Sequence, residues 1–333
     1  MGCKKTTIGG QALIEGIMMK GPSKTVIAIR TPDKSIETVD MQFSQLKDKS
    51  KFFRIPIIRG IVGFIESMVS GYKALMISAE KSGFADISEE QEDSGAQGPT
   101  EQSLPEQDKN GEKKQSVFLT VVSAVSGVLG VIIAVVLFMW IPTTLFNLFN
   151  QYIANGTADD FKVLFEGLLK LAIFVGYISA VSRMKDIKRV FMYHGAEHKT
   201  IFCYEKGNEL TVENVRNNSR FHPRCGTSFL ILMLFVGFIV NLILDIVLPD
   251  AFTSITALWV AIKIVMLPLI CGIGYELIKI CGRYENTVTK IISAPGMWMQ
   301  RLTTKEPDDD MIEVAIVALT AVKPDNPDED CWR

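Results

Sequence analysis

The sequence predicts a mainly α-helical membrane protein with a small β-rich unit at its N-terminus. Hydrophobic residues make up 48% of the 333-residue chain, and many of them are concentrated in four long apolar stretches. An α-helix needs about 20 predominantly apolar residues to cross a bilayer. About four transmembrane helices are therefore expected, at residues 117–141, 161–182, 228–248 and 255–278.

The first 43 residues are expected to form the β-rich unit. Within them, residues 25–30 and 35–39 have the composition of strands, and the intervening Thr31-Pro32-Asp33-Lys34 is typical of a turn. This pattern predicts a β-hairpin on the cytoplasmic side of the membrane.

The following segment is expected to be an amphipathic helix. Between residues 56 and 79, apolar residues recur at helical spacing, while Arg59, Glu66 and Lys73 fall at other positions. A helix of this kind is predicted to lie on the membrane or on the helical bundle, in preference to forming a fifth span.

Two further segments are defined by composition. Residues 86–115 are rich in Glu, Gln, Ser, Gly, Pro and Lys, and they have too few large apolar side chains to form a core, which predicts a disordered linker. Aspartates at 308–310 precede the apolar run 311–322, which predicts a helix with acids in its first turn. The expected organisation is a β-rich unit (1–43), an amphipathic segment (44–84), a linker (85–116), a transmembrane region (117–282) with a cytoplasmic loop (183–227), and a cytoplasmic C-terminal segment (283–333).

The distribution of Lys and Arg predicts the orientation of the spans. Residues 150–160 and 249–254 contain neither Lys nor Arg. The opposite ends of the spans are basic, and the cytoplasmic side of a membrane protein carries the excess of positive charge. Both termini and loop 183–227 are therefore expected in the cytoplasm. The basic residues are Lys113, Lys114, Arg183, Lys185, Lys188, Arg189, Lys279, Arg283 and Lys290.

Composition also limits the partners. A formal net charge of −2 argues against a basic surface that binds nucleic acid. All six cysteines fall on the expected cytoplasmic side or inside a span, where thiols stay reduced, so no disulfide framework is expected. The expected partners are the lipid bilayer and an unidentified substrate, and the chain is compatible with a homo-oligomer.

The three histidines of the chain fall within one short stretch. His194, Glu197 and His198 form an H-x-x-E-H motif, which places two imidazoles on one face of a helix with a carboxylate beside them. His222 and Cys225 form a second motif, H-x-x-C, with two more zinc-type ligands. The predicted topology brings both motifs to the same end of the spans.

These residue types predict a divalent transition metal, with zinc preferred over iron or nickel. In a catalytic site, His194, His198 and one residue of the second motif bind the ion, a water fills the fourth position, and Glu197 acts as the general base. In the alternative, both histidines of the first motif bind together with His222 and Cys225. These four ligands close a structural site on a non-enzymatic scaffold that docks a cytoplasmic partner.

Glu197 favours the catalytic interpretation, because a structural site has no need of a carboxylate there. Glu276, near the inner end of the last span, is a candidate further ligand or base. Arg220 and Arg224 either orient a substrate or are ordinary juxtamembrane arginines. A third alternative, transport, would use Asp245 and Lys263 within the spans as a relay.

Four motifs in this chain resemble those of the YqhQ-like family of bacterial membrane proteins. They lie at residues 9–19 (GGQALIEGIMM), 193–200 (YHGAEHKT), 222–228 (HPRCGTS) and 296–308 (GMWMQRLTTKEPD). The resemblance covers nearly the whole chain except the linker. It implies a metal-dependent enzyme in the bacterial cytoplasmic membrane and specifies no substrate, and the positions that it carries over are His194, Glu197, His198, His222 and Cys225.

Glu15 lies in the first of these motifs, and two interpretations of it remain open. It either completes a cytoplasmic pocket or is an acid in a turn. The leading hypothesis for the whole chain is a membrane metalloenzyme that hydrolyses a bond near the cytoplasmic surface.

Overall fold

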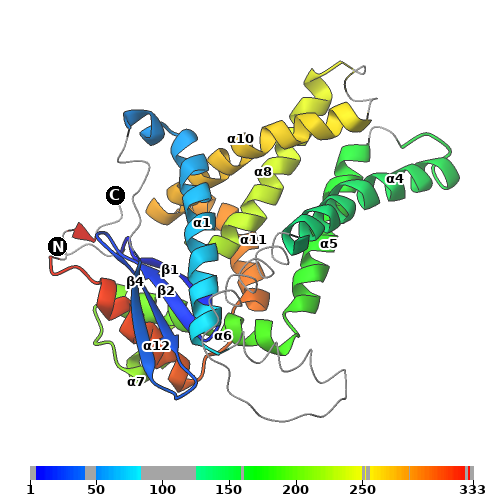
Figure 1. Cartoon of the computed structure of the whole chain (residues 1–333). Coiled ribbons are helices and arrows are strands. Elements are labelled where there is room, and N and C mark those ends of the chain that lie inside the picture. The colour runs from blue at the N-terminus through cyan, green and yellow to red at the C-terminus, as the bar shows by residue number, and fades with distance from the viewer. Residues whose placement is uncertain are drawn as a thin grey trace, which may run out of the picture. The chain divides into compact units, whose positions relative to one another are not determined.

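The computed structural model describes residues 5–41, 50–83, 125–158, 161–249, 252, 256–284, 286–326 and 329–330. These residues are mainly helical, with one small sheet (Figure 1). The chain divides into two compact units, the first formed by residues 1–89 and 177–333, the second by residues 90–176.

A four-stranded antiparallel sheet lies near the N-terminus of the first unit. Its strands are β1 (Gly9–Leu13), β2 (Gly16–Lys20), β3 (Thr25–Arg30) and β4 (Ile36–Met41), and they pair in sequence order. The predicted hairpin is confirmed as β3 and β4. β1 and β2 add a second hairpin, in which Glu15 occupies the tight turn with φ +50°.

Helices cover both faces of this sheet. On one face, α6 (Lys185–Glu205) and α12 (Asp309–Val322) share a core with β2 and β3, and the short α7 (Val212–Arg216) completes it. On the other face, α1 (Ile58–Lys81) contributes Ala74 to a second core. The sheet is thus stabilised by helices that come from three distant parts of the sequence (Figure 1).

The expected helix after the three aspartates is confirmed as α12. Asp308 is its N-cap, and Asp309 and Asp310 lie in its first turn, where their charges favour the helix dipole. Asp309 also forms an ion pair with Arg216 at the end of α7.

Small residues allow the long helices of the first unit to pack closely. These helices are α8 (Gly226–Val247), α10 (Thr256–Arg283) and α11 (Thr287–Thr303), together with α1. A Cβ at Gly60 of α1 would lie 3.1 Å from Gly272 Cα of α10, and a Cβ at Gly296 of α11 would lie 2.6 Å from Ser228 Cβ of α8. Larger side chains at these glycines would push the helices apart.

The described part of the second unit contains two helical segments. A π-helical turn at Val136–Trp140 leads into α4 (Ile141–Tyr152). The next helix is α5 (Lys162–Val181), whose residues from Tyr177 onwards belong to the first unit. Glu166 is buried, where it accepts a hydrogen bond of 3.0 Å from Thr143 Oγ1 and pairs with Lys170 one turn later.

Among the residues that the structure describes, five helices are long and apolar enough to cross a membrane. Four of them overlap the predicted spans: Val125–Tyr152, Lys162–Val181, Gly226–Val247 and Leu258–Arg283. The fifth is α1, for which the sequence predicts an amphipathic helix on the membrane or the bundle. α1 buries the small residues Gly60, Gly71, Ala74 and Ser78 and exposes Ile65, Met68, Val69, Tyr72 and Met76. Its outer surface is therefore apolar.

The packing of α12 on the sheet gives a stability prediction. Leu319 is fully buried in the core that α12 shares with β2 and β3, whereas the next residue, Thr320, is exposed. Leu319→Ala should lower the free energy of unfolding by about 2–5 kcal/mol, because the lost methyl groups leave a cavity. Thr320→Ala is the matched control and should change it by less than about 0.5 kcal/mol. Thermal unfolding of the full chain in detergent measures both, and equal effects would contradict this packing.

Candidate metal centre

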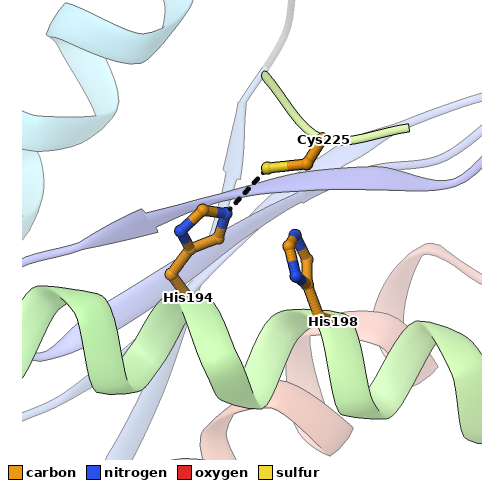
Figure 2. Close-up of side chains that lie close together, drawn as sticks. All are labelled: His194, His198 and Cys225. Carbon is orange, nitrogen blue, oxygen red and sulfur yellow. Dashed lines mark hydrogen bonds between the residues drawn. The ribbon is translucent and has the colours of Figure 1, made fainter. Parts of the chain in front are cut away.

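The first motif lies on α6, as its spacing predicts. His194 and His198 project from successive turns of one face of the helix towards Cys225 (Figure 2). The glycine between them has a packing role, since a Cβ at Gly195 would lie 2.0 Å from the carbonyl oxygen of Lys305. The segment after α11 therefore crosses α6 at Gly195, and Lys305 N–H donates a 2.8 Å hydrogen bond to Phe191 O.

Cys225 approaches the two histidines from the N-terminus of α8. It is the N-cap residue of this helix, and its Sγ accepts a hydrogen bond from Thr227 N–H at 3.4 Å. Sγ lies 3.1 Å from His194 Nε2. One donor atom from each of His194, His198 and Cys225 lies within 4.8 Å of the other two. Cys225, which follows His198 by 27 positions and His194 by 31, thus converges with both histidines at one point.

Hydrogen bonds to backbone carbonyls orient both imidazoles. His194 Nδ1 lies 2.8 Å from Thr303 O, and His198 Nδ1 lies 2.5 Å from Arg220 O. A carbonyl oxygen only accepts, so each Nδ1 carries the proton. Metal-binding histidines commonly donate their second N–H to a carbonyl or carboxylate in this way, which fixes the tautomer and directs the other nitrogen at the ion.

The electrostatics of the cluster favour a thiolate. Burial acts to raise the pKa of the Cys225 thiol, but the adjacent His194 and His198 outweigh it and hold this pKa well below its ordinary value. Burial also acts to lower the pKa of His194, and the Cys225 thiolate reverses this and raises it above the ordinary value. Both pKa directions favour an imidazolium–thiolate pair in the site without a metal, and the thiolate is the form that binds metals.

Glu197 is buried between this cluster and the sheet. Its Oε1 accepts a 3.1 Å hydrogen bond from Gly10 N–H of β1. A Cβ at Gly10 would lie 3.0 Å from the Glu197 carboxyl carbon, so glycine is required for this approach. Burial raises the pKa of Glu197, and the charges of His198 and His194 only partly offset that effect. The charges of the cluster thus influence the pKa of this carboxyl group, although its oxygens are not among the three converging donor atoms.

His222 does not join the cluster in this structure. Its Nδ1 accepts a 3.3 Å hydrogen bond from Arg224 N–H, and its Nε2 faces Glu205 at 3.7 Å. The ring also packs edge-on against Phe202. The ring of His222 also lies 5.6 Å from that of His198, centroid to centroid. Of the four ligands expected for a closed site, the structure therefore brings the donor atoms of three together, while the nitrogens of the fourth face Arg224 and Glu205.

The other candidate residues also have specific partners. Glu276 forms an ion pair with Arg59 across the α1–α10 contact. Arg220 contributes its carbonyl to His198, while its side chain bonds Thr304 and Glu306. Arg224 pairs with Glu205, and it donates a 3.1 Å hydrogen bond to Thr6 O.

Glu15 lies in a turn, the position that one of its two interpretations expects. From the β1–β2 turn it pairs with Arg189 and accepts a 3.1 Å hydrogen bond from Tyr193 OH. Both partners lie on α6 just before His194. The contact fixes the first hairpin against the helix that carries the histidines.

Several positioning residues have no motif that identifies their role. Gln300 is fully buried, accepts from His222 N–H at 2.7 Å, and donates to His222 O at 2.6 Å and Ser228 Oγ at 2.9 Å. It ties loop 222–228 to α11. Thr303 and Gly10 act through backbone groups, which any residue type possesses. The only sequence signal for Gln300 is its place in the motif at residues 296–308.

The family model described as "Protein of unknown function (DUF1385)" matches residues 55–325 of this chain. The chain belongs to this family. It is also 35% identical over 311 residues to "Uncharacterized protein YqhQ" of Bacillus subtilis (strain 168), an alignment that covers 92% of this chain and 89% of that relative. No solved structure matches. The resemblance inferred from the motifs is confirmed, and neither description assigns an activity.

The geometry predicts which substitutions remove a metal. His198→Ala and Cys225→Ala should each lower bound zinc well below one equivalent, because each deletes a converging donor atom. His222→Gln should leave the zinc content near that of the unchanged protein. Elemental analysis of the purified full chain provides the measurement. Loss of zinc from His222→Gln together with unchanged folding would contradict the three-ligand cluster.

Proposed function

We propose that this protein is a metal-dependent hydrolase whose site lies at the cytoplasmic face of the bacterial cell membrane. The observation that carries the proposal is the convergence of two imidazoles and one thiolate beside a buried carboxyl group. Two histidines and one cysteine are a ligand set that zinc accepts in enzymes.

Three protein ligands favour a catalytic site over a closed one. Zinc in proteins is usually four-coordinate, so a three-ligand set leaves one position for water or substrate. A bound ion of this kind would supply a water whose pKa falls towards about 7 and would polarise a substrate carbonyl. The alternative scaffold needs a fourth protein ligand, and the partners of His222 support the open arrangement.

Glu197 is the residue we assign to proton transfer. Gly10 N–H holds one carboxylate oxygen, so the carboxyl group has a defined orientation. A raised pKa brings a buried carboxyl group closer to neutral pH, where a general base both accepts and returns a proton efficiently. In the proposed reaction Glu197 accepts a proton from water and delivers it to the leaving group.

The position of Cys225 supports a site at the membrane surface. It caps α8, which is long and apolar enough to cross a bilayer. The basic residues at this end of the spans favour the cytoplasmic side. On this topology both termini are cytoplasmic.

Cobalt substitution tests whether the site is open. The cobalt-loaded full chain should change its visible spectrum on addition of acetohydroxamate, because the hydroxamate takes the position left by three protein ligands. A spectrum that is insensitive to acetohydroxamate would favour the closed scaffold site.

A second experiment tests the role of Glu197. Glu197→Gln should retain the metal and lower the turnover of amide and ester substrates by about 10²–10⁴-fold, the range typical for loss of a general base. Glu209→Gln, at an exposed position near the end of α6, is the matched control and should keep full turnover. Equal turnover in the two variants would overturn the assignment.

A further inference from the structure

The helix α11 has two faces with different surroundings. Its inward side chains pack on the rest of the first unit, and among them Gln300 and Thr303 are buried. The outward side is apolar and exposed, with exposed fractions of 63% for Val288, 67% for Ile291 and 54% for Trp298. Ile291 and Trp298 are seven residues apart, which is about two helical turns, so they lie on the same side of the helix. Helices that lie on a membrane have such an apolar face.

The charged side chains of α11 are all basic. The helix carries Lys290 and Arg301 and contains neither Asp nor Glu. Both side chains are exposed, and within the described part of the chain neither has an ion-pair partner. Arg283, which ends α10, is also exposed and precedes α11 by a short connection. A basic helix with an apolar face fits a surface of anionic lipid headgroups, which attract Lys and Arg.

α11 lies at the level where two candidate membrane spans end. It begins four positions after the last residue of α10 and then packs on the first turn of α8. A Cβ at Gly296 would lie 2.6 Å from Ser228 Cβ, and Gln300 Nε2 donates a 2.9 Å hydrogen bond to Ser228 Oγ. Thr303 Oγ1 also donates to Thr227 Oγ1 at 3.4 Å. Because α8 and α10 are each long and apolar enough to cross a bilayer, their ends lie at the headgroups, where tryptophan is enriched.

We propose that the exposed face of α11 binds the anionic lipid surface on the cytoplasmic side of the membrane. Ile291 and Trp298 enter the boundary between headgroups and acyl chains, while Lys290 and Arg301 pair with lipid phosphates. The level of the helix favours lipid over a soluble protein, because such a protein would have to displace headgroups from between the ends of two spans. This inference rests on the membrane location in the proposed function and does not depend on the metal chemistry.

The inner face of the same helix supports the candidate metal centre. Thr303 O accepts a hydrogen bond from His194 Nδ1, and Gln300 bonds the backbone of His222. An α-helix with its side chains is about 10–12 Å across, so the headgroups and these contacts lie on opposite sides of one helix. The lipid surface therefore binds the helix that orients His194.

Quenching by brominated lipid tests the contact at Trp298. With the full chain in phosphatidylglycerol nanodiscs, the difference in emission between the unchanged protein and Trp298→Phe reports this side chain. Bromine near the headgroup end of the acyl chains should quench it more strongly than bromine near the chain ends, because an interfacial helix buries its apolar face only about 5–10 Å deep. Stronger quenching by the deep bromine, or quenching by dissolved iodide and by neither lipid, would overturn the proposal.

Neutralising the two cations tests the preference for anionic lipid. In the unchanged protein, shallow bromine should quench Trp298 more strongly in phosphatidylglycerol than in phosphatidylcholine nanodiscs. The double substitution Lys290→Gln with Arg301→Gln should abolish this difference. Lys24→Gln with Lys34→Gln is the matched control, because it removes the same charge from exposed positions outside α11, and it should keep the difference. Equal behaviour of the two double variants would contradict binding of anionic lipid by α11.

The number of chains in each nanodisc separates a lipid partner from a second copy of the protein. Shallow quenching that is present with one chain and lost with two would assign this face to a second copy and overturn the proposal. Zinc content and incorporation into nanodiscs are measured on the same samples. Absence of quenching in an incorporated, zinc-loaded chain would overturn this inference and leave the proposed function standing. Failure to incorporate would contradict the membrane location on which both rest.

Discussion

Two hydrogen bonds from imidazole Nδ1 atoms to backbone carbonyls determine what the candidate metal centre can bind. His194 bonds Thr303 at the end of α11, and His198 bonds Arg220 in the loop before α8. Because both Nδ1 atoms are used, the two Nε2 atoms are left for a ligand, and His194 Nε2 already contacts Cys225. Rotation of either ring would break its bond and leave a buried polar group without a partner, which costs about 1–3 kcal/mol.

The carbonyls that fix the imidazoles belong to segments far from α6 in the sequence, so the centre depends on the fold of the whole first unit. Gln300 connects the loop of His222 to α11. Gly10 lets β1 approach Glu197 of α6, Gly195 lets the segment after α11 cross α6, and Gly296 lets α11 pack closely on α8. The site is therefore assembled by close backbone contacts.

Local patterns in the sequence predict much of this structure. Periodicity identifies the hairpin of β3 and β4, four apolar helices and the start of α12, and the spacing of H-x-x-E-H places both histidines on one face of a helix. The partners of His222 and Glu276 are not predictable in this way, because Glu205 and Arg59 are distant in sequence and become neighbours only through packing. The first hairpin is likewise missed, since Gly-Gly and a tight turn at Glu15 give little strand signal. The helix α1 illustrates a further limit, because its small residues face inward and its large apolar residues face outward.

The central claim is that a metal at this site has exactly two imidazoles and one thiolate from the protein. X-ray absorption spectroscopy of the zinc-loaded full chain tests it most directly. The account predicts one sulfur at about 2.3 Å and three nitrogen or oxygen neighbours at about 2.0–2.1 Å, two of which are imidazoles. A third imidazole in place of the non-protein ligand would identify His222 as a ligand and contradict an open site.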